Sequence, residues 1–157
     1  SCAVVEDLSA VEEIRPGNFV YFDWMQVIIG SCKVEDVAVA LACPVVTKNA
    51  SRNQIVVYGG GVHLSKDFTV DGKGRTSFGA VCLPTETGWS APFEDTYVSS
   101  LSQEHGVLTV APADFDRIQI GELVCILPAH SCMTADLMKT VVTLSGEEIP
   151  MLHLEAI

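Results

Sequence analysis

The feature that most constrains the fold is a succession of short apolar runs, each closed by glycine, proline, asparagine or other turn residues. Many of the runs contain β-branched residues, and some alternate apolar with polar side chains as half-buried strands do. No stretch sustains a helical period. We therefore expect an all-β fold, a small β-barrel or sandwich with short helical turns. The expected strands are residues 19–24, 37–47, 54–58, 78–83, 97–102, 107–110, 123–127 and 139–144, with a last short element in 149–157.

The connections add detail to this expectation. Residues 9–12 (Ser-Ala-Val-Glu) have the pattern of a capping box for a short helical turn, and Pro44 predicts a bulge or bend within its long strand. The three glycines 59–61 lack a phosphate-binding pattern and predict a tight bend at a barrel corner. Residues 71–74 predict a hairpin turn, and residues 84–92 an irregular loop.

Length and charge limit the possible partners. The 157 residues fit one domain, which at this size buries about two thirds of its unfolded surface. The net charge of -11, from 20 acidic against 9 basic residues, argues against a nucleic-acid or anionic-membrane partner. We find no apolar run of transmembrane length and no signal sequence at the start, so we expect a soluble domain.

The six cysteines favour a reducing compartment. They form no Cys-x-x-Cys pair and no regular spacing, and several lie within apolar runs, where a free thiol behaves as a small hydrophobic group. We expect a cytoplasmic protein without a disulfide framework. The cysteines are Cys2, Cys32, Cys43, Cys82, Cys125 and Cys132.

The pair His130 and Cys132 is the candidate metal site. The run 123–127 has the length of a buried strand, and Pro128 ends its ladder because it has no N–H to donate. If the backbone stays extended beyond Pro128, the two side chains face the same side. An imidazole and a thiolate there can hold one soft divalent ion. The alternative from the residues alone is a core cysteine beside a surface histidine.

Four segments, in order along nearly the whole chain, resemble one enzyme family. Residues 13–23 (EIRPGNFVYFD), 102–106 (SQEHG) and 127–132 (LPAHSC) are similar to segments of the C-terminal domain in D-serine dehydratase and D-threonine aldolase type enzymes. Residues 60–67 (GGVHLSKD) resemble a fourth, less specific segment of that domain.

This resemblance implies a two-domain pyridoxal-phosphate enzyme of the alanine-racemase-like fold. An N-terminal (β/α)8 barrel would carry the Schiff-base lysine, and a C-terminal β domain, residues 1–157, would carry the metal ligands. Ser1 would follow the phosphate loop of the barrel, so we expect this chain alone to be inactive. The resemblance also implies that the full-length enzyme is a homodimer. No lysine matches the Schiff-base position among Lys33, Lys48, Lys66, Lys73 and Lys139.

The resemblance also implies a reaction. His130 and Cys132 would bind zinc, which a thiolate favours over manganese or magnesium. Their His-x-Cys spacing resembles the dehydratase branch, which eliminates water from D-β-hydroxy amino acids such as D-serine, D-threonine or 3-hydroxyaspartate to give a 2-oxo acid and ammonia. The alternatives are a D-threonine aldolase-type retro-aldol lyase, whose members tend to have His-x-Asp, a racemase-like or non-catalytic module completing a dimer interface, and a stand-alone binding barrel.

Other residues are weaker candidates. The resemblance puts His105 and Glu104 near the pocket, although a polar turn between two strands explains them equally well. Tyr21 is a candidate for facing the cofactor, and the alternative is a packed strand tyrosine. We expect His63 to be a loop histidine, and His153 has no functional argument. Trp24 and Trp89 are expected to pack in the core or against the barrel.

Overall fold

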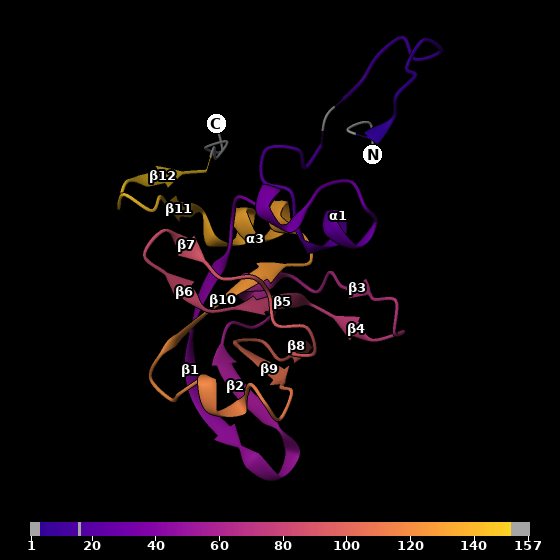
Figure 1. Ribbon diagram of the computed structural model, residues 1–157. Coiled ribbons are helices and arrows are strands. Elements are labelled where there is room, and N and C mark those ends of the chain that lie inside the picture. The colour runs from indigo at the N-terminus through magenta and orange to yellow at the C-terminus, as the bar shows by residue number, and fades with distance from the viewer. Residues whose placement is uncertain (1–3, 16, 152–157) are drawn as a thin grey trace.

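The structure, a computed structural model, describes residues 4–15 and 17–151, and within them six antiparallel strands close into a barrel (Figure 1). Closure pairs both edges of every strand, which removes the exposed edges that invite aggregation. The predicted all-β barrel is thus confirmed. In order around the barrel the strands are β1 (Leu41–Asn49), β10 (Leu123–Pro128), β5 (Gly79–Cys82), β8 (Tyr97–Leu101), β9 (His105–Thr109) and β2 (Gln54–Tyr58).

The main core fills the inside of the barrel. In β2 and β9 alternate residues are buried, as the two-residue period of a strand dictates. Ile55 of β2 lies opposite Leu108 of β9, and both side chains are fully buried.

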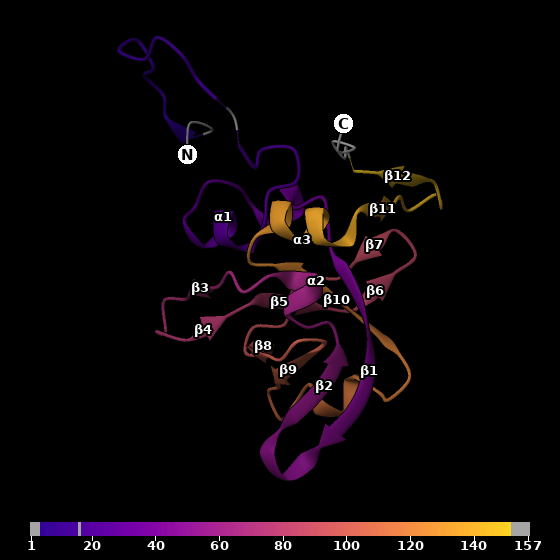
Figure 2. The ribbon, with the colours of Figure 1, turned by 180° about the vertical axis from the view of Figure 1, so that it is seen from behind.

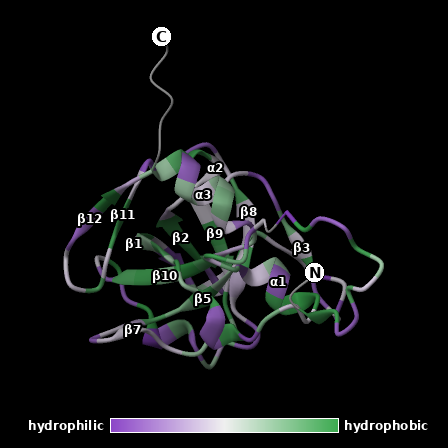
Figure 3. Ribbon diagram, turned by 90° about the horizontal axis from the view of Figure 1, so that it is seen from above, coloured by the Kyte–Doolittle hydropathy of each residue, from purple (hydrophilic) through white to green (hydrophobic). Residues whose placement is uncertain are grey.

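Burial raises the pKa of the Cys43 and Cys82 thiols to about 12, so these two cysteines behave as small hydrophobic groups, as expected. Figure 3 shows the hydrophobic residues along the barrel strands.

Short hairpins and helices surround the barrel (Figures 1 and 2). The hairpins are β3 (Thr69–Val70) with β4 (Thr76–Ser77), β6 (Pro84–Thr85) with β7 (Gly88–Trp89), and β11 (Thr140–Val142) with β12 (Glu148–Pro150). The α-helices are α1 (Trp24–Ile28), α2 (Gly61–Leu64) and α3 (Ser131–Met138), and the 3-10 turns are η2 (Val34–Asp36), η3 (Ala50–Arg52) and η4 (Phe115–Arg117). None of the helices in 4–15 and 17–151 has the length and apolar character to cross a membrane.

A second core cluster lies on the outer face of the barrel. Buried Val37, Cys82 and Leu127 form part of it, and Trp24 and Trp89 pack against it. The two tryptophans therefore pack in a core, as expected. This cluster joins α1 to the barrel wall, at the end of the molecule where α1 and α3 lie together in both Figure 1 and Figure 2.

The strand expected at 19–24 is wrong. The chain makes a turn there and then enters α1 at Trp24. Phe22 has a positive φ of 48°, and the Asp23 carboxylate accepts a hydrogen bond from the Gln26 backbone N–H at 2.9 Å. Such an N-cap starts a helix, so local capping overrides the β propensity of the aromatic residues.

The strand expected at 37–47 begins late. Residues 37–40 lie outside the barrel, where Val37 packs in the second cluster and the Ala38 N–H donates to the Tyr21 carbonyl at 2.7 Å. The register shift falls between Val45 and Thr47 rather than at Pro44, which stays in register opposite Leu123. The apolar run 37–47 thus packs in two places, first in the second cluster and then, from Leu41, in the barrel. Hydrophobicity alone does not distinguish these two environments.

Three smaller expectations also change. Residues 9–12 form a turn and not a helical turn, and the loop 84–92 contains the hairpin β6–β7. The chain between His130 and Lys139 forms α3, which the sequence pattern did not predict. Of the last element, β12 is described, whereas residues 152–157, including His153, lie outside the described residues, as does Cys2.

Candidate metal centre

His130 and Cys132 lie at the junction between β10 and α3. His130 is extended, with φ −136° and ψ 101°, and α3 begins at Ser131. The backbone therefore does not stay extended through Cys132, and that premise of the sequence argument is wrong. Instead, Cys132 lies in the first helical turn with an exposed side chain, and the His130 side chain keeps 38% of its surface exposed.

Asn18 contacts both residues that follow His130. Its Oδ1 accepts from the Ser131 hydroxyl at 2.8 Å and from the Cys132 thiol, with Sγ at 3.3 Å. Its amide nitrogen donates to the Asp23 carboxylate. Residues 13–23 are far from α3 in sequence, so this network attaches the N-terminal segment directly to the candidate site.

Asp23 joins the starts of two helices. Its Oδ1 caps α1, and its Oδ2 accepts from the Ser131 backbone N–H at 3.2 Å. The side chain is 2% exposed. Burial raises the pKa of this carboxyl, while the hydrogen bonds from Gln26, Ser131 and Asn18 oppose the shift. A single buried carboxylate thus fixes the helix on which Cys132 lies.

The pKa of the Cys132 thiol is also raised. Burial is the largest cause, and the Asp23 carboxylate adds to it by repelling a thiolate. In the metal-free chain Cys132 is therefore a thiol that donates to Asn18. A bound cation would favour the thiolate, which is the form of cysteine that binds metals.

Asp67 contacts the other candidate ligand. Its Oδ2 lies 2.8 Å from Nδ1 of His130. Asp67 follows α2, whose start is held by the 102–106 segment: the N–H groups of Gly59, Gly61 and Val62 donate to the carbonyls of residues 104, 102 and 103. At Gly60 a Cβ would lie 2.5 Å from the Glu104 carbonyl carbon, so only glycine fits this approach.

His105 belongs to an aromatic cluster. Its ring centroid lies 5.8 Å from that of Tyr58, which in turn lies 5.0 Å from that of His63. The Nδ1 of His63 accepts from the Gly60 N–H at 3.1 Å. Glu104 contributes its backbone carbonyl to the α2 contact, and its side chain is exposed. The structure thus places His105 with Tyr58 and His63.

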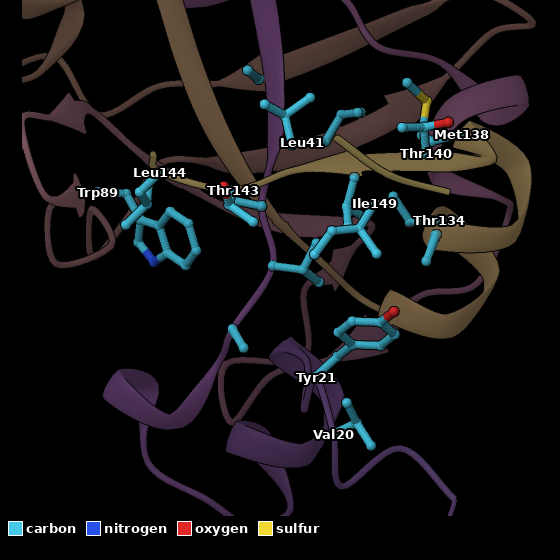
Figure 4. Close-up of a pocket in the computed structure, with 17 residues that line it drawn as sticks. Val20, Tyr21, Leu41, Trp89, Thr134, Met138, Thr140, Thr143, Leu144 and Ile149 are labelled. Carbon is cyan, nitrogen blue, oxygen red and sulfur yellow. The ribbon is translucent and has the colours of Figure 1, made fainter. Parts of the chain in front are cut away.

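Tyr21 lines a cavity of about 520 Å³ (Figure 4). It lies in the turn before α1 rather than in a strand, and its hydroxyl donates to the Met151 sulfur at 3.4 Å. Around it are Trp89, Leu144 and Ile149, and Figure 4 shows these side chains arranged about the same space. The cavity is bounded by the start of β1, α3 and the hairpin β11–β12.

Within the described residues, no three or more histidine, cysteine, aspartate or glutamate side chains are grouped so that they could hold an ion. The candidate centre is therefore a pair, His130 and Cys132. Asn18, Asp23, Asp67 and Ser131 were not predicted as site residues. All four lie within the segments that carry the family resemblance, and that was the available signal.

The comparison with family models identifies one match. Residues 38–144 match the family described as "Putative serine dehydratase domain". The chain is 35% identical over 130 residues to D-serine dehydratase of Dictyostelium discoideum. This match covers 80% of the present chain and 31% of the Dictyostelium protein. It thus spans about a third of the length of this curated relative.

Solved structures share the fold. An alanine-racemase-like protein from Idiomarina loihiensis superposes with a TM-score of 0.78 at 28% identity, covering 94% of this chain and 39% of that one. D-threo-3-hydroxyaspartate dehydratase from Delftia sp. HT23 gives 0.76 at 26% identity, over 97% of this chain and 41% of that one. The similar structures also include a cysteine-to-alanine variant of D-threo-3-hydroxyaspartate dehydratase in the metal-free form. The chain belongs to the serine dehydratase domain family and corresponds to the C-terminal β domain of its alanine-racemase-like members.

Proposed function

We propose that residues 1–157 form the zinc-bearing C-terminal domain of a D-β-hydroxy amino acid dehydratase. The observation that carries the proposal is the pair His130 and Cys132, accessible at the β10–α3 junction in a chain of the dehydratase family. The related D-serine and D-threo-3-hydroxyaspartate dehydratases support this substrate class. The similar structure of a metal-free cysteine-to-alanine variant supports a metal role for Cys132.

The donor set fits zinc. One imidazole and one thiolate are ligands that zinc prefers, and a thiolate disfavours magnesium or manganese. Both side chains are accessible, and two protein ligands leave positions for water, substrate or a group from another part of the protein. A site with open positions suits a catalytic ion better than a structural one.

The reaction would convert a D-β-hydroxy amino acid to a 2-oxo acid and ammonia, so that D-serine would give pyruvate. Bound zinc would supply a Lewis acid that lowers the proton affinity of the β-hydroxyl, in the way that zinc lowers the pKa of bound water to about 7. The residues of this chain would hold the ion and orient its ligands. His130 and Cys132 would bind the ion, and Asp23 would fix the start of α3 through the Ser131 N–H. Asn18 accepts from the Cys132 thiol only in the metal-free chain, because the thiolate that binds an ion has no proton to donate.

The lysines of this chain do not fit a covalent pyridoxal-phosphate site. Lys48 donates to the Phe115 and Ile118 carbonyls at 2.7 and 2.6 Å, and Lys73 and Lys139 pair with Asp95 and Asp136. Lys33 is exposed, and Lys66 lines a shallow cavity at the 102–103 loop. We therefore assign pyridoxal phosphate to an N-terminal (β/α)8 domain of a longer polypeptide.

Two further proposals follow from the family. The longer protein would be a homodimer, as the resemblance to the alanine-racemase-like family implies. It would work in the cytoplasm, since Cys32, Cys43, Cys82, Cys125 and Cys132 are all free thiols, as in a reducing compartment.

A metal titration of the chain tests the site. We expect the wild-type chain to bind one zinc ion in competition with a chromophoric chelator, and cobalt to give a thiolate charge-transfer absorption. His130→Ala and Cys132→Ala should each lower the affinity at least tenfold, or about 1.4 kcal/mol, and Cys132→Ala should abolish the cobalt–thiolate band. His153→Ala, which removes an imidazole with no assigned function, is the control. Binding that is unchanged in Cys132→Ala would refute the proposal.

A further inference from the structure

The hydrogen bond between the Asp67 carboxylate and His130 can have only one donor. The Oδ2 of Asp67 lies 2.8 Å from Nδ1 of His130, 63 residues away along the chain. An ionised carboxylate can only accept, so Nδ1 of His130 must donate. A neutral imidazole carries one N–H, so a proton on Nδ1 leaves the lone pair on Nε2. The contact therefore selects one of the two tautomers of His130.

The residues that precede Asp67 hold it in place. The Asp67 backbone N–H donates to the hydroxyl of Ser65 at 3.1 Å, and Ser65 is buried with a positive φ of 65°. Just before it, Leu64 ends α2 with a fully buried side chain, and α2 packs against α3. The segment that carries Asp67 is thus fixed against the helix that follows His130.

We propose that Asp67 is a positioning residue that sets the Nδ1–H tautomer of His130 and presents Nε2 to the metal. This assignment rests on the proposed zinc site. The pairing of a ligand histidine with a carboxylate orients the ring and raises its basicity. It also gives a function to the 60–67 segment, whose glycines and α2 bring Asp67 to a histidine from the other end of the chain.

The same chain contains a histidine of the opposite tautomer. Nδ1 of His63 accepts from the Gly60 N–H at 3.1 Å, so neutral His63 must carry its proton on Nε2. Long-range ¹H–¹⁵N spectra distinguish the two tautomers. His63 therefore serves as an internal reference against which the effect of Asp67 on His130 is measured.

The experiment compares the ¹⁵N-labelled metal-free chain with Asp67→Asn at alkaline pH, with His130 assigned from the signal lost in His130→Ala. We expect Nδ1–H at His130 in the wild type and a rise of the Nε2–H form in Asp67→Asn, with His63 unchanged. The rise should be larger in Asp67→Ala, because the amide oxygen of asparagine can still accept from Nδ1. In a parallel titration, Asp67→Asn should raise the Kd for zinc by roughly 10- to 100-fold. The matched control is Asp116→Asn, which removes an exposed carboxylate from η4.

The outcomes separate this assignment from the proposed function. A His130 tautomer that is unchanged in Asp67→Ala, which has no acceptor, would overturn the assignment, as would a loss of zinc affinity of the same size in Asp116→Asn. If the wild-type chain binds no zinc while the tautomer still responds to Asp67, the metal site fails and the orientation of His130 by Asp67 stands. Asp67→Asn provides the second variant should Asp67→Ala unfold.

Discussion

At the residue scale, the candidate centre depends on a few polar side chains that each satisfy several partners. Asn18 accepts from Ser131 and Cys132 and donates to Asp23, and Asp23 in turn accepts from backbone groups at the starts of α1 and α3. Within the described residues, no buried side-chain nitrogen or oxygen lacks a hydrogen-bond partner. Satisfied networks of this kind give a local structure a single arrangement.

Asp23→Asn should destabilise the chain. The amide keeps only one acceptor oxygen, so the donors at one end of the side chain face an NH₂ group. We expect a loss of about 1–3 kcal/mol in the free energy of unfolding, because a buried donor without an acceptor keeps its desolvation cost. Urea unfolding followed by circular dichroism measures it.

The control is Asp116→Asn, which removes an exposed carboxylate and should change the free energy of unfolding by less than about 0.5 kcal/mol. An equal stability of Asp23→Asn and the wild type would contradict the description of Asp23 as the acceptor that links the starts of the two helices.

At the scale of elements, two segments meet where α2 begins. The 102–106 turn between β8 and β9 supplies carbonyls to the backbone of residues 59–62, and the exit of α2 leads to Asp67. The sequence predicted a tight bend at the three glycines. In the structure Gly59 and Gly60 connect β2 to α2, which begins at Gly61, and Gly60 is required by the close approach of two backbones.

Gly60→Ala should be strongly destabilising. The added Cβ would lie 2.5 Å from both the Glu104 carbonyl carbon and the His105 nitrogen, and backbone atoms cannot move aside as a side-chain end can. Overpacking of this kind costs about 1–3 kcal/mol or more. Thermal and urea unfolding of the variant measure the loss.

Gly72→Ala is the matched control, because a Cβ there would meet nothing within 4 Å. It should leave the chain as stable as the wild type or slightly more stable. Similar midpoints for Gly60→Ala and Gly72→Ala would contradict the close approach of the two segments.

At the scale of the whole molecule, the candidate centre lies at one end of the barrel. The α1 and α3 helices and the hairpin β11–β12 lie at the same end, with the candidate centre among them (Figure 1). Apolar side chains there remain exposed, among them Val20, Val142 and Leu144 at 63%, 64% and 72%. The curated relative is about three times as long as the matched part.

Joining the chain to its upstream coding sequence should give dehydratase activity that the chain alone lacks. We expect a 2-oxo acid and ammonia from D-serine or D-threo-3-hydroxyaspartate, loss of activity with a chelator, and recovery with zinc. Full activity in the metal-free enzyme would contradict the role of the ion. Glycine and an aldehyde as products would indicate the aldolase reaction instead.

The amino-acid sequence by itself determined the β class, strands such as β2 and β10, the family and the pair His130 and Cys132. These follow from alternation, apolar runs and short local segments, which are properties of neighbouring residues. Tertiary structure decided that Cys132 lies in a helix, that residues 19–24 turn into α1, and that Asn18, Asp23 and Asp67 contact the pair. The Asp23 cap of α1 is a local contact, which the β-prone aromatic run conceals in the sequence. The hydrogen bonds of Asp67 with His130 and of Asn18 with Cys132 join residues 63 and 114 apart along the chain, so they form only when folding brings these segments together.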